Sequence, residues 1–117
     1  MKLTYVGKIP TLNNMYKNVI VGGKLRRAVS KQHKHFKKDI AKYAKLRGFK
    51  IIEGKVEMRI YVNFTRKGRD IDNIVKPIKD ALKGIAYNDD SQVYKNTQVK
   101  NESKAHGEYC EIDVREL

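Results

Sequence analysis

The sequence lacks the residues and segments that would give disulfide bonds, a membrane-spanning helix or a signal peptide. It has 117 residues with one cysteine, two prolines and no tryptophan. The lone Cys110 excludes an intrachain disulfide, and it alternates with Ile112 and Val114 as expected for the buried face of a strand. No apolar run approaches the roughly 20 residues that a bilayer-spanning helix needs, and the first residues lack a signal-peptide apolar region. We therefore expect a cytoplasmic protein without a membrane segment.

Acidic residues are also scarce relative to basic ones. The chain has 13 Asp and Glu against 26 Lys and Arg, which gives a formal net charge of +13. Such a surface attracts polyanions, nucleic acid above all. The length and the 40% share of hydrophobic residues suit one domain, spanning residues 1–117, with a single modest core. A dimer that buries further apolar area is a reasonable expectation for so small a core.

The first half of the chain predicts a strand, a hairpin and a helix. Strand formers occupy residues 3–8, and Asn13-Asn14 signals a turn. Apolar arms on both sides of Gly22-Gly23 predict a β-hairpin with a primed turn and a basic second arm. Ser30 is suited to cap a helix that runs to about Arg47.

The second half predicts three strands and another helix. Residues 55–64 alternate between apolar and polar side chains, as in a half-buried strand. The next helix buries apolar residues at four-residue intervals, and Pro77 makes its first turn irregular if Asp72 is the N-cap. Residues 92–100 and 107–115 are the last expected strands. This order predicts a mixed sheet with two helices on one face, of the α/β or α+β class.

Carboxylates gather in one stretch of this basic chain. Asp70 and Asp72 are two residues apart and, if the backbone is extended, they leave it on the same side about 6.6 Å apart. Asp90 follows after the predicted helix, and Lys76 would point from the first helical turn towards the same end. Carboxylate oxygens are ligands for Mg²⁺ or Mn²⁺, which would let such residues approach a phosphate. The pattern points to a metal-dependent nuclease.

Structural roles are also open to these carboxylates. Asp72 or Asn73 could cap the helix, and residues 89–91 could form a turn with side-chain hydrogen bonds. Asp70 could form an ion pair with Arg69 or Arg66. From spacing alone, a metal site and these structural roles both remain possible.

The other ionisable residues are weaker site candidates. Asp80 lies in the middle of the second helix beside Lys79 and Lys83, where an exposed surface ion-pair partner is more consistent than a metal ligand. His33 and His35 face different ways on the first helix, which makes them a poor metal pair. We expect His33 to pack or to be solvated, and His106 to lie in a loop.

Two segments, residues 69–82 and 88–93, closely resemble the RusA-type Holliday junction resolvases. The segment at residues 10–16 also resembles the opening of that family. The resemblance implies that Asp70, Asp72 and Asp90 are catalytic carboxylates that bind Mg²⁺, with Mn²⁺ as a possible substitute, and that Lys76 is their essential charged partner. Alignment backwards from Gln92 favours Asp90 over its neighbour. A homodimer that cuts four-way DNA junctions by paired symmetric nicks is also implied.

Basic residues supply candidate DNA contacts. The stretch from residue 24 to residue 50 is almost free of acids, and a second basic loop precedes the carboxylates. The candidates are Lys24, Arg26, Arg27, Lys31, Lys34, Arg66, Lys67 and Arg69. Two alternatives to a junction-resolving enzyme remain: a non-catalytic basic DNA-binding module, and a less selective nuclease for branched DNA.

Overall fold

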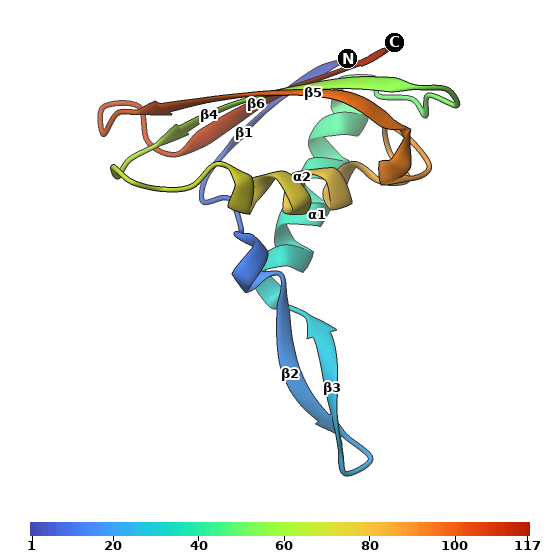
Figure 1. Ribbon diagram of the computed structural model, residues 1–117, viewed down its shortest axis with the longest axis vertical. Helices are drawn as coiled ribbons and strands as arrows, with labels where there is room; N and C mark the ends of the chain where they lie inside the picture. The colour runs from blue at the N-terminus through green and yellow to red at the C-terminus, as the bar shows by residue number, and fades with distance from the viewer.

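The computed structural model, which describes residues 1–13 and 15–117, consists of a mixed sheet, two helices and a projecting hairpin (Figure 1). The sheet has the strand order β1-β6-β4-β5, formed by β1 (Lys2–Val6), β6 (Tyr109–Glu116), β4 (Val56–Phe64) and β5 (Val93–Glu102). Strand β4 is antiparallel to β6 and parallel to β5, and β1 is antiparallel to β6. Helices α1 (Lys31–Leu46) and α2 (Asp72–Leu82) both lie on one face of this sheet. The predicted mixed sheet with two helices is confirmed, and the fold is α+β.

Strand β4 follows the predicted alternation but is more buried than expected. Its inward side chains are almost completely inaccessible, as the apolar pattern predicts. Two polar residues on the other face, Glu57 and Asn63, are buried as well, so the prediction of a half-buried strand is wrong at both ends. The Asn63 amide donates to the carbonyl oxygens of Ser103 (2.9 Å) and Gly107 (2.7 Å). These bonds satisfy a buried polar group that would otherwise be costly.

Glu57 is buried by charge compensation. Its carboxylate lies 3.4 Å from Arg59, 3.6 Å from Lys95 and 3.7 Å from Arg115. The three basic residues come from three neighbouring strands, so the carboxylate links them on the face of the sheet that the helices leave open. The charge of Glu57 is therefore compensated on this face.

Helix α1 begins and ends as the sequence predicts. The Ser30 hydroxyl oxygen accepts a hydrogen bond from the backbone N–H of His33 at 3.1 Å, which is an N-cap. Phe36, Ile40 and Ala44 are buried against the core, and the helix stops before Gly48, whose φ of 72° suits glycine.

Helix α2 begins differently from the prediction. The residue before it, Ile71, has helical angles of φ −63° and ψ −31°, so Asp72 is the first helical residue and not the N-cap. The Asp70 carboxylate accepts from the backbone N–H of Asp72 at 3.0 Å. Bonds from Asn73 N to Asp70 O and from Ile74 N to Ile71 O tighten the first turn. The irregular first turn was expected from Pro77 with Asp72 as the N-cap, whereas these tight bonds come before Pro77 and start at Asp70.

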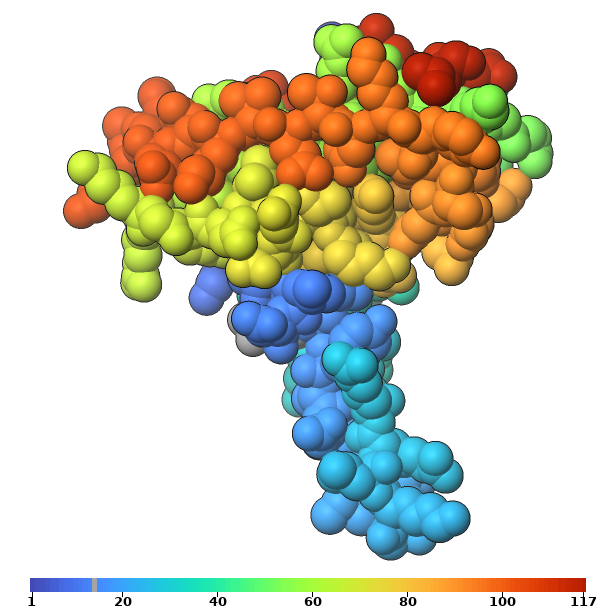
Figure 2. All heavy atoms as spheres, viewed as in Figure 1, coloured from blue at the N-terminus to red at the C-terminus, as the bar shows by residue number. Residues whose placement is uncertain are grey.

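A two-stranded hairpin, β2 (Tyr16–Val21) and β3 (Lys24–Val29), projects from the rest of the molecule as a separate sheet (Figures 1 and 2). Gly22 and Gly23 connect its strands with φ of 60° and 76°, the positive values of a type I′ turn. The predicted hairpin and its turn are confirmed. It follows a short 3-10 helix, η1 (Leu12–Asn14), where a turn was expected. Asn14 itself lies outside the described residues.

Across the part of the chain that the structure describes, neither helix has the length and apolar character to span a membrane.

Candidate active site

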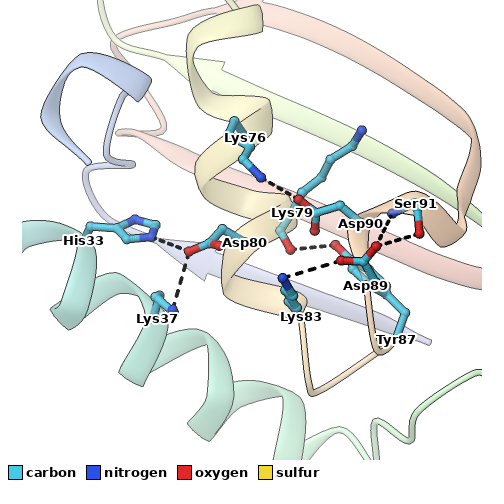
Figure 3. A network of polar contacts seen from close by, with 10 residues as sticks. All are labelled: His33, Lys37, Lys76, Lys79, Asp80, Lys83, Tyr87, Asp89, Asp90 and Ser91. Atoms are coloured by element: carbon cyan, nitrogen blue, oxygen red, sulfur yellow. Dashed lines mark hydrogen bonds and ion pairs between the residues drawn. The ribbon is translucent and has the colours of Figure 1, made fainter. Parts of the chain in front are cut away.

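The carboxylates of interest lie along a crossover that joins two parallel strands. The chain leaves β4, turns through a basic loop, runs along α2 and returns through the 3-10 helix η2 (Asp90–Gln92) into β5. Asp70 and Asp72 lie at the start of α2, whereas Asp90 opens η2 beyond its far end. Lys76 lies between them on the helix. Figure 3 shows Lys76 and Asp90 with their neighbours.

Lys76 and Asp90 are in direct contact. The ammonium Nζ of Lys76 lies 2.6 Å from Asp90 Oδ2 (Figure 3). This hydrogen bond raises the pKa of Lys76; burial acts against the shift, and the charges of Asp90 and Asp80 add to it. Lys76 is therefore a cation at neutral pH and cannot serve as a general base there. It can donate hydrogen bonds and stabilise negative charge.

The second oxygen of Asp90 is without a partner. Asp90 Oδ1 is buried and accepts no hydrogen bond from any described residue. A buried, unpaired carboxylate oxygen is unfavourable unless something else satisfies it, such as an ordered water or a cation. This atom is the strongest structural sign of a ligand position in the crossover.

Asp89 has a structural role instead. The hydroxyl and backbone N–H of Ser91 both donate to Asp89 Oδ2, at 2.6 Å and 3.3 Å, and Lys83 lies 3.4 Å from Oδ1. Gln92 completes a capping box by accepting from the backbone N–H of Asp89. These bonds from Ser91 lower the pKa of Asp89, with a smaller contribution from Lys83. Both oxygens of Asp89 are thus engaged in holding the turn, unlike those of Asp90.

Asp70 and Asp72 are exposed at the start of α2. The extended backbone considered for them is wrong, because the intervening Ile71 is helical. One oxygen of Asp70 accepts a hydrogen bond from the backbone N–H of Asp72, a local role that differs from the arginine pairing considered for it. Its other oxygen has no protein partner among the described residues.

The donor chemistry suits a hard divalent cation, but these residues are not gathered into one cluster. Carboxylate oxygens are preferred ligands of Mg²⁺ and Mn²⁺, and Asp90 Oδ1 is available. Among the residues that the structure describes, however, no three Asp, Glu, His or Cys side chains lie close enough together to hold a metal ion. A site that uses all three aspartates therefore requires a rearrangement or a further chain.

A second polar cluster ties the two helices together. The imidazole Nε2 of His33, a fully buried residue on α1, donates to Asp80 Oδ2 on α2 at 2.8 Å, and Lys37 lies 3.4 Å from the same oxygen (Figure 3). Burial acts against ionisation of Asp80, yet the hydrogen bond from His33 and the charge of Lys37 hold its pKa below the usual range. Asp80 is an ion-pair partner, as expected, but its described partners are His33 and Lys37 on α1 instead of lysines on its own helix, and it is only partly exposed. His33 is buried.

The sequence did not show that His33 and Asp80 meet, because they are 47 positions apart. Apolar spacing predicted that both helices cover the same core, but not which residues face each other across them. The capping box at Asp89 could have been predicted from the sequence, because an acid followed three residues later by glutamine is a known helix-start signal.

The candidate DNA-contacting residues fall into three places. Those on strand β3 and at the start of α1 are exposed: Lys24, Arg26, Arg27, Lys31 and Lys34. Arg66 and Lys67 are exposed in the loop after β4. Arg69 differs from the rest, because it pairs with Glu108 at 2.7 Å and lies 4.4 Å over the Phe64 ring.

A basic α+β protein with a lysine and carboxylates on a strand–helix–strand crossover has the chemistry of a protein that acts on nucleic acid. Comparison with protein families identifies the group more closely: residues 7–115 match the model of the family described as endodeoxyribonuclease RusA. Because the match covers nearly all of the 117 residues, the chain belongs to this endodeoxyribonuclease family. No curated protein matches the chain.

Proposed function

We propose that this protein is a Mg²⁺-dependent endonuclease that resolves four-way DNA junctions by paired symmetric nicks. Membership of the endodeoxyribonuclease RusA family supports cleavage within DNA strands. The net charge of +13 supports binding to the phosphate backbone. The preference for a four-way junction over other branched DNA is the finer part of the proposal.

The contact between Lys76 and Asp90 carries the proposal. These residues come from different elements, 14 positions apart, and meet at 2.6 Å. An ion pair in which one side chain is half exposed and the other partly exposed contributes little to stability, about 1 kcal/mol at most. A cation held beside a carboxylate that keeps one free, buried oxygen is better explained as part of a reaction site.

Asp70, Asp72 and Asp90 are the proposed metal ligands. When bound, Mg²⁺ would stabilise charge on the phosphate and supply a water of lowered pKa. Asp90 would offer Oδ1, while its Oδ2 remains oriented by Lys76. Asp70 and Asp72 would offer the carboxylate oxygens exposed at the start of α2. Asp89 is excluded from the set because Ser91 and Lys83 engage both its oxygens.

Lys76 is proposed to act on the phosphate. Its ammonium can donate to a non-bridging oxygen, where negative charge increases as the phosphodiester is attacked. Because Asp90 raises its pKa, Lys76 would keep its proton throughout the working pH range. The proton of the attacking water must therefore leave by another route.

A homodimer is proposed because junction resolution requires two cuts. A two-fold dimer presents two equivalent sites, which matches the approximate two-fold symmetry of a four-way junction. Paired nicks on symmetry-related strands leave duplexes that a ligase can seal.

The test is cleavage of an end-labelled immobile four-way junction and a matched linear duplex in Mg²⁺. Wild type should nick the junction symmetrically and leave the duplex intact. Asp72→Asn should lower junction cleavage by at least about 100-fold. Binding measured in Ca²⁺ should persist in the variant.

Asp113→Asn is the matched control. Asp113 lies on β6, faces away from the helices and pairs with Arg115 at 2.9 Å, so its variant loses the same charge elsewhere. Its cleavage should equal that of wild type. Equal binding without metal-dependent cleavage by any of the three proteins would indicate a non-catalytic DNA-binding module. Equal cutting of flaps, forks and junctions would indicate a less selective nuclease.

A further inference from the structure

The hairpin tip exposes apolar side chains that the fold does not use. Ile20 on β2 and Leu25 on β3 are 77% and 69% exposed and face each other in register across the hairpin. Neither belongs to the hydrophobic core or packs against it. The tip is the part of the hairpin farthest from the body, as Figure 2 shows, so this apolar surface projects into solvent.

Cations without acidic partners accompany this pair. Residues 16–29 contain four basic residues and no Asp or Glu. The basic residues are Lys17, Lys24, Arg26 and Arg27. None of the ion pairs that the structure describes involves them, and only Arg27 has a described partner, the Tyr16 ring at 4.6 Å. The hairpin therefore combines an uncompensated positive charge with an apolar tip.

The strand register places the apolar pair Ile20 and Leu25 on the opposite face of the hairpin from Lys24 and Arg26. Ile20 and Leu25 share one face of the ribbon with the Asn18–Arg27 pair below them. The other face carries Lys24 and Arg26 on β3, opposite valines of β2. The apolar pair at the tip thus shares its face with one cation, Arg27, while Lys24 and Arg26 lie on the opposite face.

The tip is also narrow and lies on an arm that starts near the proposed site. A Cβ atom added at Gly22 or Gly23 would meet no other described atom within 4 Å, so no other described part of the chain packs against the turn. At the base of the arm, η1 packs against α2, the helix that carries Lys76. Nucleic acid bound at Lys76 would therefore pass beside the arm.

We propose that the tip of the hairpin, formed by Ile20 and Leu25, is an apolar wedge that packs against unstacked bases at a DNA branch point. This inference rests on the proposed function and specifies how the substrate is recognised. Apolar side chains inserted between base steps, with nearby cations on the phosphates, are a known way of deforming DNA. A branch point suits such a wedge because its bases are already less well stacked than those of a duplex.

Charge favours DNA over a second copy of this chain as the partner. Two copies each carry +13, and their basic arms would repel one another at moderate salt. The phosphates of a junction attract the same arms, and its exposed base faces accept the apolar tip.

The test uses a four-way junction with 2-aminopurine at the branch point and a linear duplex with the same label, both in Ca²⁺. Binding of wild type should raise the fluorescence of the branch-point base, as expected when it loses its stacking partner. Ile20→Ser combined with Leu25→Ser should abolish this rise and weaken junction binding by about tenfold. Binding to the duplex should change by less than about twofold, because the cations remain.

Leu46→Ser is the matched control. Leu46 is 76% exposed at the end of α1, so its variant also exchanges an exposed apolar side chain for serine, and it should behave like wild type. An unchanged fluorescence rise and unchanged junction preference in the double variant would overturn the wedge. So would a wild-type dimer that the double variant converts to monomer, since the tip would then join two copies.

The outcomes for the wedge and for the proposed function are separable. Wild type that cleaves junctions without any fluorescence rise overturns the wedge and leaves the nuclease intact. Wild type that gives the rise, lost in the double variant, without ever cleaving supports the wedge and overturns the nuclease.

Discussion

The sheet-and-helix body and the projecting hairpin use the same kinds of residue in opposite ways. In the body, apolar side chains are buried, and charges such as that of Glu57 are compensated by neighbours on adjacent strands. In the hairpin, Ile20 and Leu25 are exposed and the cations have no acidic partner among the described residues. The body thus supplies stability and places the carboxylates, whereas the hairpin leaves its apolar and basic side chains exposed, where the proposed wedge would use them.

We expect the largest effect on stability from a core substitution in the sheet-and-helix body. Phe36 is fully buried and meets the Tyr5 ring edge-on at 4.8 Å. Phe36→Ala should lower the free energy of unfolding by about 3–5 kcal/mol, as measured by urea denaturation. Leu25→Ala in the hairpin should lower it by less than about 1 kcal/mol. Similar losses in the two variants would mean that the hairpin is part of the stabilising structure.

Lys76 should separate activity from stability. Lys76→Gln should lower junction cleavage by about 100-fold or more, while the free energy of unfolding changes by less than about 1 kcal/mol. Lys83→Gln is the control, because Lys83 has the same side-chain exposure of 49% and also pairs with an aspartate of the same turn. Equal activity losses in both variants would show that general positive charge, not Lys76 itself, is required.

The His33–Asp80 contact should make the stability of the body depend on pH. Because the folded-state pKa of Asp80 is lowered, its contribution is present above its unfolded value of about 4 and is lost as the pH falls through the folded-state value. Asp80→Asn should cost about 1–2 kcal/mol at neutral pH.

Urea denaturation of both proteins at neutral pH and near pH 3 measures this contribution. The difference between them should shrink at the lower pH. A difference that is the same at both values would show that the charge of Asp80 does not matter.

The smallest effect is expected from single cations of the hairpin. Arg26→Gln should reduce the slope of log affinity against log salt concentration by about 1 for any DNA sequence. Arg59→Gln, which removes an arginine paired with Glu57 on the open face of the sheet, should leave the slope unchanged. Fluorescence anisotropy at several salt concentrations measures both. An unchanged slope for Arg26→Gln would remove the hairpin from the DNA-contacting surface.

Periodic patterns predicted most of the fold. The alternation of residues 55–64 defined β4, and Gly22-Gly23 defined the hairpin turn, because each signal depends on residues that are close in sequence. The burial of Glu57 and Asn63 was not predictable in this way, since it depends on partners from other strands and from a distant loop.

The candidate site was predictable as a set of residues but not as an arrangement. Sequence reasoning selected Asp70, Asp72, Lys76 and Asp90. The structure brings Lys76 into contact with Asp90 and joins Asp70 to the backbone of Asp72, but it does not bring these two pairs together among the described residues. Whether residues 70–72 are extended or helical depends on the tight backbone bonds of the first turn of α2, which no residue type in the sequence specifies. The partner of Arg69, Glu108, could not be inferred because the two residues are 39 positions apart in the sequence.

The most direct measurement compares Asp90→Asn with Asp89→Asn in junction cleavage at saturating Mg²⁺. The two residues are adjacent, and the variants lose the same charge, but only Asp90 contacts Lys76 and keeps a free buried oxygen. We expect Asp90→Asn to abolish cleavage while binding in Ca²⁺ persists. Asp89→Asn should cleave like wild type, with slightly reduced stability. Full cleavage by Asp90→Asn would contradict the assignment of the site.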